Sequence, residues 1–240
     1  MACVVKWTQP HWLEVAVKLL IFGATGMVGQ GVLRECLEDA SVELVTTIGR
    51  STTGTKDLRL KEIVHADMAD YSAIEDRLRG FDACFFCLGV SSAGMNEADY
   101  ARVTYGFTLA AAETLARLNM GMTFIYVSGA GTDSTGRGRI MWARVKGRTE
   151  NALLALPLKA FMFRPGLIQP LDAIRSKTRS YRIFYGLAGP LLSLLRWVMP
   201  KQVVSTRDVG KAMLSVARQG YSKRILESED IRKAAAGCDS

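Results

Sequence analysis

The sequence predicts an α/β protein built on one doubly wound parallel sheet, followed by a small C-terminal lobe. The chain has 240 residues, 49% of them hydrophobic, which is enough for one domain with a large core. Short apolar runs alternate with amphipathic helical stretches through the first two thirds of the chain, the order of a parallel sheet with right-handed crossovers. A glycine-rich turn at residues 23–29 follows the first of these runs, as in a Rossmann fold.

Six strands are expected in this part of the chain. Each is a short run of apolar or β-branched residues, which is typical of strands buried on both faces of a sheet. The strands are expected at residues 17–22, 43–49, 62–65, 83–88, 123–128 and 159–164. The helices are expected at residues 30–39, 71–79, 97–118 and 139–156.

The alternation ends after Gln169-Pro170. Beyond it the sequence predicts an irregular stretch with one apolar helix, and then a helix that begins after Ser205 and ends near Gln219. Ser205, with Asp208 in the first turn, is a usual signal for a helix N-terminus. We therefore divide the chain into an N-terminal extension (1–14), a Rossmann core (15–170), a substrate-pocket or lid segment (171–204), and a C-terminal helix that returns to the core with a tail (205–240).

Basic residues are concentrated in the second half of the chain. The formal net charge is +8, but residues 1–120 carry −4 and residues 121–240 carry +12. A basic surface can bind nucleic acid or an anionic membrane. Nucleic acid is not expected, because the sequence has no helix-turn-helix, no zinc-ligand spacing and no aromatic residues interleaved with the basic ones. The basic segment 175–182 and the apolar residues beside it leave a membrane surface as an alternative partner.

The cysteines indicate a reducing, cytoplasmic setting, because five is an odd number and too few for a disulfide scaffold. Cys84 and Cys87 lie in one apolar strand, where side chains three residues apart point to opposite faces, so both are expected to pack in the core. No group of His, Cys, Asp and Glu has metal-ligand spacing, and we expect no metal. No signal peptide is expected, and no apolar stretch reaches the ~20 residues that span a bilayer.

The strongest motif is Gly23-Ala24-Thr25-Gly26-Met27-Val28-Gly29, which lies between an apolar strand and an amphipathic helix. In such a turn the first glycine allows a tight bend and the second lets the backbone approach a pyrophosphate. The third allows the helix to pack closely on the strand. The N–H groups at the start of the helix then face the phosphates. The motif predicts a dinucleotide site.

The end of the second strand favours NADP(H) over NAD(H). An NAD site has an acidic residue here to bind the ribose 2′-hydroxyl. This chain has Ile48-Gly49-Arg50-Ser51 instead. The planar guanidinium of Arg50 suits a 2′-phosphate, and Ser51 can add a second donor. At the end of the third strand, Asp67-Met68 is expected to meet the adenine.

Four segments together resemble the short-chain dehydrogenase/reductase superfamily. They are the turn 23–29, Phe86-Cys87-Leu88-Gly89, Tyr126-Val127-Ser128-Gly129-Ala130 and Arg164-Pro165-Gly166. Within that superfamily the chain is most similar to the atypical or extended, epimerase/dehydratase-like members, which include oxidoreductases of the Tat-interacting-protein type. The resemblance covers about residues 17–225. It implies that the cofactor-binding residues are Gly23, Thr25, Gly26, Met27, Val28, Gly29, Arg50, Ser51, Asp67, Met68, Leu88, Gly89, Lys146, Arg164, Pro165 and Gly166.

The resemblance also implies a catalytic set of a serine after the fifth strand and Tyr-x-x-x-Lys on the next helix. Ser128 and Lys146 match this pattern, but Trp142 stands where the family has tyrosine. A tyrosine phenol can donate and recover a proton, whereas an indole N–H only donates a hydrogen bond. Trp142 therefore cannot perform the proton transfer.

Three functions remain open at this point. The protein can be an NADP(H)-dependent oxidoreductase of a small carbonyl or alcohol, with the proton coming from water or another group. Tyr126 is one candidate for that group, but a core position is favoured for it, and Tyr100 and Tyr105 are weaker candidates. The protein can instead bind NADP(H) without redox turnover, as a sensor or a regulator that binds a partner. The fold can also carry an unrelated reaction. The apolar residues of segment 171–204 favour a hydrophobic small-molecule substrate for the expected substrate lobe.

Overall fold

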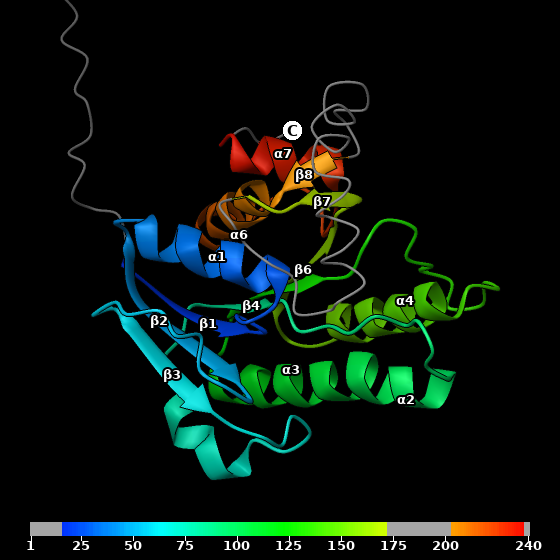
Figure 1. Ribbon diagram of the computed structural model, residues 1–240, viewed down its shortest axis with the longest axis horizontal. Helices are drawn as coiled ribbons and strands as arrows, with labels where there is room; N and C mark the ends of the chain where they lie inside the picture. The colour runs from blue at the N-terminus through cyan, green and yellow to red at the C-terminus, as the bar shows by residue number, and fades with distance from the viewer. Residues whose placement is uncertain (1–15, 172–202, 238–240) are drawn as a thin grey trace, which may run out of the picture.

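Seven parallel strands form the central sheet of the computed structural model, which describes residues 16–171 and 203–237 (Figure 1). The strand order is β3-β2-β1-β4-β5-β6-β9. The strands are β1 Val17–Phe22, β2 Val42–Gly49, β3 Leu60–Val64, β4 Ala83–Phe86, β5 Thr123–Val127, β6 Lys159–Arg164 and β9 Ile225–Glu227. A separate parallel pair consists of β7 Leu167–Gln169 and β8 Val203–Ser205. The α/β, doubly wound parallel Rossmann fold is confirmed.

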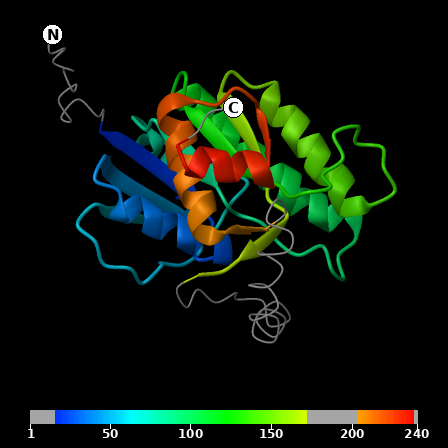
Figure 2. The same cartoon turned by 90° about the horizontal axis from the view of Figure 1, so that it is seen from above.

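Helices cover both faces of the sheet (Figures 1 and 2). On one face α1 packs against α6, and α6 packs against α7. On the other face lie η1, α3 and α4, with α2 and η2 leading into α3. The α-helices are α1 Met27–Glu38, α2 Glu97–Ala101, α3 Phe107–Leu118, α4 Met141–Leu154, α6 Thr206–Gln219 and α7 Ser228–Ala235. Two other helical segments are η1 Ser72–Leu78, a 3₁₀-helix, and η2 Arg102–Gly106, a π-helix.

Each strand contributes alternate residues to two separate cores. Leu19 and Ile21 of β1 pack under α1 and α6, whereas Leu20 and Phe22 pack on the α3 and α4 side. All four side chains are fully buried. This two-sided burial explains why the strands are continuous apolar runs in the sequence. Cys84 and Cys87 pack in opposite cores, as their spacing predicted.

The order in which the chain adds strands changes from one side of β1 to the other between β3 and β4. The chain starts at β1, extends to β2 and β3 on one side, and then crosses to β4, β5 and β6 on the other. The carboxyl ends of β1 and β4 therefore form the switch point at which such sheets bind ligands. The turn after β1 lies at this point.

Several expected elements differ in detail from the structure. The first helix begins at Met27 rather than at residue 30, because the glycine turn itself forms the helix start. Residues 71–79 contain a 3₁₀-helix, and the helix expected at 97–118 includes the π segment η2. The strands β7, β8 and β9 were not expected, since each has only three residues and is too short to show a period.

The C-terminal part confirms one local prediction and corrects another. Ser205 accepts a hydrogen bond from the Asp208 backbone at 3.0 Å, and the Asp208 carboxylate accepts one from the Ser205 backbone at 2.8 Å. This capping box begins α6 as predicted. Residues 205–240 hold more than a helix and a tail, because β9 joins the sheet edge beside β6 and α7 follows it. The expected extension 1–14 and nearly all of segment 171–204 lie outside the described residues. Among the residues that are described, no helix is long and apolar enough to cross a membrane.

Candidate active site

The turn after β1 has the backbone geometry of a phosphate-binding loop. Gly23 has a φ of +75°, and a β-carbon there would lie 2.6 Å from the backbone nitrogen of Leu88. A β-carbon on Gly29 would overlap the carbonyl oxygen of Gly23. No side chain caps α1 at Gly26, so the first N–H groups of the helix have no intrahelical or side-chain acceptor. The turn therefore fits a dinucleotide pyrophosphate in both shape and dipole.

A pocket extends from this turn to the ends of β2 and β4. It has a volume of about 130 Å³. Its lining residues are Gly23, Ala24, Thr25, Thr47, Ile48, Gly49, Arg50, Ser51, Thr53, Met68 and Leu88. Six of the expected cofactor-binding residues are thus brought together, and the rest of the glycine turn adjoins them.

The far end of this pocket is basic. Arg50 and Ser51 are both exposed where β2 ends, and no Asp or Glu is among the described residues that line the pocket. Thr53 also lines it and was not identified from the sequence, because a threonine four residues after the strand carries no motif. Its backbone N–H donates to Glu62 on β3 at 2.6 Å, which holds the loop in place.

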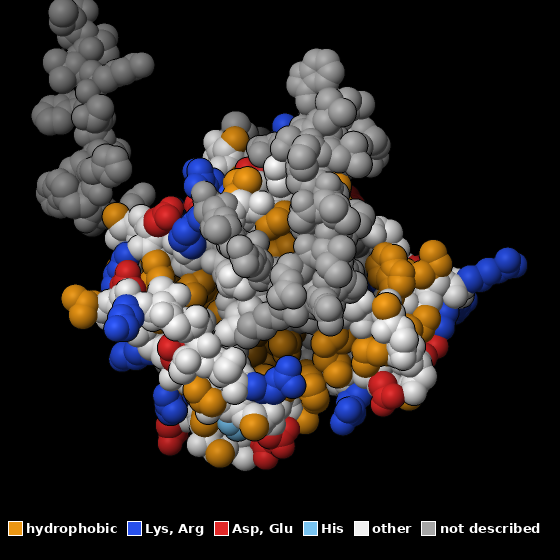
Figure 3. Space-filling view, in the orientation of Figure 1, with side chains coloured by type: hydrophobic (Ala, Val, Ile, Leu, Met, Phe, Trp, Pro, Cys, Tyr) orange, Lys and Arg blue, Asp and Glu red, His pale blue; other side chains and the backbone are white. Residues whose placement is uncertain are grey.

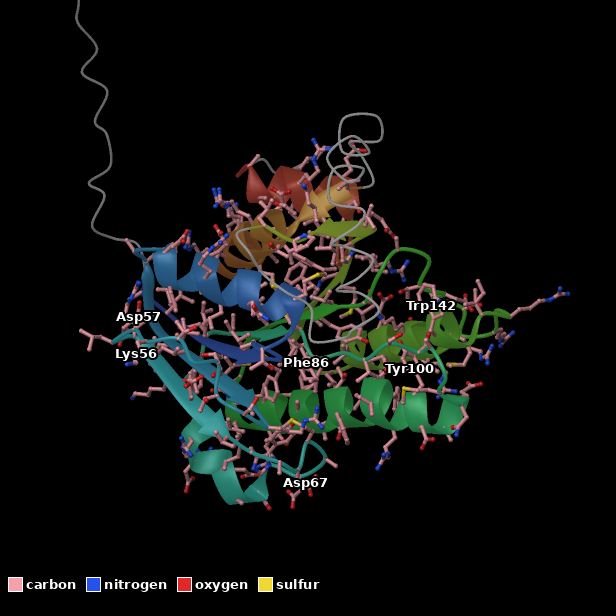
Figure 4. The ribbon with its side chains drawn as sticks, in the orientation of Figure 1. Lys56, Asp57, Asp67, Phe86, Tyr100 and Trp142 are labelled. Atoms are coloured by element: carbon pink, nitrogen blue, oxygen red, sulfur yellow. The ribbon has the colours of Figure 1, made fainter. Side chains whose placement is uncertain are left out.

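The remaining cofactor predictions fall into two groups. Asp67 is exposed outside the pocket lining, and its carboxylate accepts from the backbone of Ala69 at 2.9 Å (Figure 4). Gly89 is exposed just after Leu88. Pro165 and Gly166 lie beside the predicted catalytic residues, where the Pro165 carbonyl accepts from the backbone of Ala130 at 2.9 Å.

Ser128 is held in a buried polar cluster at the end of β5. It is 5% exposed, and its Oγ donates to Oε1 of Glu150 at 2.5 Å. The carbonyl oxygen of Phe163 lies 3.2 Å from the same Oγ. Glu150 is fully buried on α4, one turn after Lys146.

Lys146 lies next to Ser128. Its Nζ donates to the backbone carbonyl oxygen of Ser128. Burial lowers the pKa of the Lys146 ammonium from its ordinary value of 10.5 to about 8, against the smaller opposing effect of the Glu150 charge. A group with this pKa exchanges a proton close to neutral pH.

Trp142 lies in the first turn of α4, half-buried. A β-carbon on Gly131 would lie 3.5 Å from its Cη2, so the indole packs along the loop that follows β5. Figure 4 places Trp142 on α4 and Tyr100 on α2, at the same end of the molecule. Arg144, also on α4, forms an ion pair of 2.5 Å with Glu97 of α2 and so connects the two helices.

The tyrosines near the site do not replace the missing phenol. Tyr126 is buried in the core on the α3 and α4 side of the sheet, and Tyr100 is buried on α2. Burial raises the pKa of Tyr126 far above its ordinary value, which makes it a poorer proton donor. Tyr105 is exposed beneath the guanidinium of Arg148, whose Cζ is 5.9 Å from the ring centre. The core position favoured for Tyr126 is confirmed.

The described contacts of the Arg164 side chain are with Glu150, Ser134 and Glu227. Arg164 was expected to contact the dinucleotide, but its side chain is turned into the protein. Its Nε donates to Glu150 at 3.0 Å, its Nη2 donates to Glu150 and to Ser134, and its Nη1 lies 3.5 Å from Glu227. Through these hydrogen bonds, Arg164 holds the carboxylate of Glu150 in position.

Glu150 is the residue of this cluster that sequence reasoning missed. The signal that could have found it is its position four residues after Lys146, which places both side chains on one face of α4. An acidic residue on this face, followed by an arginine at the end of the next strand, is compatible with a buried ion pair.

Comparison with known proteins agrees with the observed fold. Residues 19–136 match the NAD dependent epimerase/dehydratase family. The structure of Bordetella bronchiseptica WbmF in complex with NAD⁺ is similar to this fold, with a TM-score of 0.65 and 11% identity over 92% of this chain and 77% of that one. A short chain dehydrogenase family protein from Francisella tularensis also has a similar fold, with a TM-score of 0.63 and 13% identity over 91% of this chain and 99% of that one. The chain therefore shares the fold of the short-chain dehydrogenase/reductase superfamily and is similar in sequence to its epimerase-like members.

Two curated proteins are similar to this chain in sequence. Protein FMP52-2, mitochondrial, of Scheffersomyces stipitis is 29% identical over 171 residues, which are 69% of this chain and 73% of that protein. Protein HTATIP2 of Rattus norvegicus is 27% identical over 154 residues, 62% of each chain. The cytoplasmic location expected from the cysteines is contradicted, because the fungal FMP52 relatives are mitochondrial proteins by name. Unpaired cysteines indicate reducing conditions and do not identify a compartment.

Proposed function

We propose that this protein is an NADP(H)-dependent oxidoreductase acting on a small, hydrophobic carbonyl or alcohol substrate. The observation that carries the proposal is the pocket that joins the glycine turn to Arg50. Its described lining combines a backbone cradle for the pyrophosphate with an arginine at the ribose end and no carboxylate. A carboxylate there would repel a 2′-phosphate, whereas a guanidinium binds it with two parallel hydrogen bonds.

Ser128 and Lys146 are the predicted catalytic residues of this reaction. When bound, the nicotinamide dinucleotide supplies or accepts a hydride. Lys146 is proposed to bind the ribose beside the nicotinamide, and its Nζ can take or release a proton because burial brings its pKa to about 8. Trp142 has no proton to exchange in this range, and its indole packs along the loop that follows β5.

A hydrophobic substrate is supported by the surface around this end of the molecule. In Figure 3, hydrophobic side chains gather on the α2–α4 side. Ile140, which precedes Trp142 by two residues, is 58% exposed, and Val90 after β4 is 41% exposed. Exposed apolar side chains beside a polar pocket are typical of small-molecule sites.

A second candidate function is redox-inactive NADP(H) binding, as a sensor or a regulator of a partner. Trp142 at the tyrosine position favours it, because the usual proton donor is missing. The glycine turn and Arg50 would serve such a binder equally well.

One pair of assays separates the two functions. Isothermal titration with NADPH and NADH measures the cofactor preference, and loss of NADPH absorbance over a panel of apolar aldehydes and ketones, with NADP⁺ reduction over the matching alcohols, measures turnover. Tighter NADPH binding with turnover supports the oxidoreductase. Tight NADPH binding without turnover in either direction supports the redox-inactive binder, and binding of neither dinucleotide contradicts both.

A further inference from the structure

The hydroxyl group of Ser128 has one hydrogen, and within the described part of the chain the two groups in hydrogen-bond reach of it are acceptors. Oε1 of Glu150 lies 2.5 Å from Oγ and the carbonyl oxygen of Phe163 lies 3.2 Å from it. The Phe163 carbonyl already accepts the backbone N–H of Ser128 at 2.8 Å. Glu150 is therefore the stronger acceptor, and the hydroxyl hydrogen points into the protein.

Glu150 is held as an acceptor by Arg164. The carboxylate is fully buried and receives hydrogen bonds from Nε and Nη2 of this arginine. Arg164 is itself 9% exposed and is further held by Ser134 at 2.6 Å and by Glu227 at 3.5 Å. A guanidinium has only hydrogen-bond donors, so the Glu150 oxygens that face it are acceptors.

We propose that Glu150 fixes the Ser128 hydroxyl as a hydrogen-bond acceptor toward the substrate, so that the site binds an alcohol O–H in preference to a carbonyl oxygen. With its hydrogen given to Glu150, Oγ offers a ligand only its lone pairs. An alcohol can donate to these lone pairs, and a ketone cannot. This inference rests on the proposed function and assigns the substrate class of the same site.

The energetics of the cluster support a fixed orientation. To donate to a ketone, Ser128 would give up a short, charge-assisted bond for a neutral one. It would also leave a buried carboxylate oxygen with one donor fewer, which is costly in a low-dielectric interior. An alcohol needs no such exchange. The site therefore favours binding of the alcohol. The alcohol is the substrate when the reaction runs as an oxidation and the product when it runs as a reduction.

Glu150 is a positioning residue in this scheme, and Glu150→Gln tests it. Arg164 Nη2 donates to Oε2, and Nε is within hydrogen-bond distance of both oxygens, at 3.0 Å from Oε1 and 3.2 Å from Oε2. An amide oxygen at the Oε2 position can accept from both nitrogens, so we expect this orientation, which turns the NH₂ group toward Ser128. That NH₂ donates to Oγ and releases the hydroxyl hydrogen. Glu227→Gln is the matched control, because Glu227 faces the same arginine but has no contact with Ser128.

The binding probes are 1-phenylethanol and acetophenone, which share an apolar skeleton. The alcohol is titrated into the NADPH complex and the ketone into the NADP⁺ complex, so that neither pair can react. The wild-type protein and Glu227→Gln are expected to bind the alcohol at least about tenfold more tightly than the ketone. This ratio corresponds to the free energy of roughly one hydrogen bond, the one that the alcohol O–H donates to Ser128 Oγ. Glu150→Gln is expected to abolish or invert this ratio, and Ser128→Ala to weaken only the alcohol.

A neutron structure of the deuterated wild-type protein reads the same orientation without any probe or variant. Deuterium on the line from Ser128 Oγ to Glu150 is expected. Deuterium directed away from Glu150, a ketone bound as tightly as the alcohol, or binding of neither probe overturns the inference. Because NADPH binding is measured first, its failure marks the loss of the proposed function and is distinct from these outcomes.

Discussion

The α-carbon of Gly29 lies so close to the carbonyl group of Gly23 that a β-carbon on Gly29 would overlap the oxygen. Gly29→Ala is therefore expected to force α1 away from the end of β1. Overpacking of this kind costs about 1–3 kcal/mol, and the displaced helix start weakens phosphate binding as well. Thermal unfolding and NADPH titration measure the two effects.

The control for this prediction is Gly106→Ala. Gly106 has helical backbone angles, and the nearest atom to an added β-carbon is 4.0 Å away. This variant should keep both the melting temperature and NADPH affinity. A Gly29→Ala protein as stable as Gly106→Ala, with unchanged NADPH affinity, would contradict the packing account of the turn.

Arg50 is predicted to set the preference for NADP(H). Arg50→Ala removes the only arginine or lysine among the described residues that line the pocket, so NADP⁺ affinity should fall about 10- to 100-fold while NAD⁺ affinity changes little. Lys56→Ala is the charge-matched control, since Lys56 is exposed on the loop before β3 and outside the pocket lining (Figure 4). Equal losses for both cofactors would refute the 2′-phosphate role.

Lys146 predicts a pH dependence of stability. Burial lowers its pKa from 10.5 to about 8, so the folded state binds this proton more weakly than the unfolded state does. The destabilisation is fully present below pH 8 and is relieved as the pH rises from about 8 to 10.5. Across this window the wild-type protein should gain up to about 3 kcal/mol relative to Lys146→Met.

Denaturant unfolding at several pH values checks this prediction. Lys159→Met, which removes an exposed lysine at the start of β6, measures the effect of losing one surface charge. A constant stability difference between wild type and Lys146→Met from pH 7 to pH 10 would show that Lys146 is not buried in the way described.

Trp142→Tyr tests how the site supplies its proton. A phenol at this position restores the family's proton donor next to Lys146, so kcat for carbonyl reduction should rise by roughly 10²-fold or more if the native site lacks an efficient donor. Trp142→Phe is the control, since it keeps an aromatic ring and adds no hydroxyl. An unchanged kcat in Trp142→Tyr would place the native proton donor elsewhere.

The parts of the fold that could be predicted depend on local signals. The glycine turn between residues 23 and 29 is recognisable because backbone atoms lie close to each of its three glycines, and this requires glycine at those positions of the sequence. Ser205 and Asp208 likewise predict the start of α6 because a capping box involves only neighbouring residues. The six longer strands could be located because burial on both faces requires continuous apolar runs.

The polar cluster could not be predicted in the same way. Glu150 and Arg164 come from different elements, and their pairing depends on how α4 lies across β6. Sequence periodicity places a residue on a helix face but does not name its partner. The resemblance to the superfamily located Ser128 correctly at the end of β5, yet it gave no indication that its hydroxyl is directed to a buried carboxylate.

Direct detection of hydride transfer tests the central claim most directly. The protein is incubated with NADP⁺ and a panel of small apolar secondary alcohols carrying deuterium on the carbinol carbon, and the recovered NADPH is analysed by mass spectrometry. An NADP(H)-dependent oxidoreductase predicts deuterium in the NADPH with at least one of these alcohols, at a rate that falls in Arg50→Ala. Absence of deuterium with every alcohol, at saturating NADP⁺, would contradict the account and leave a redox-inactive dinucleotide-binding protein.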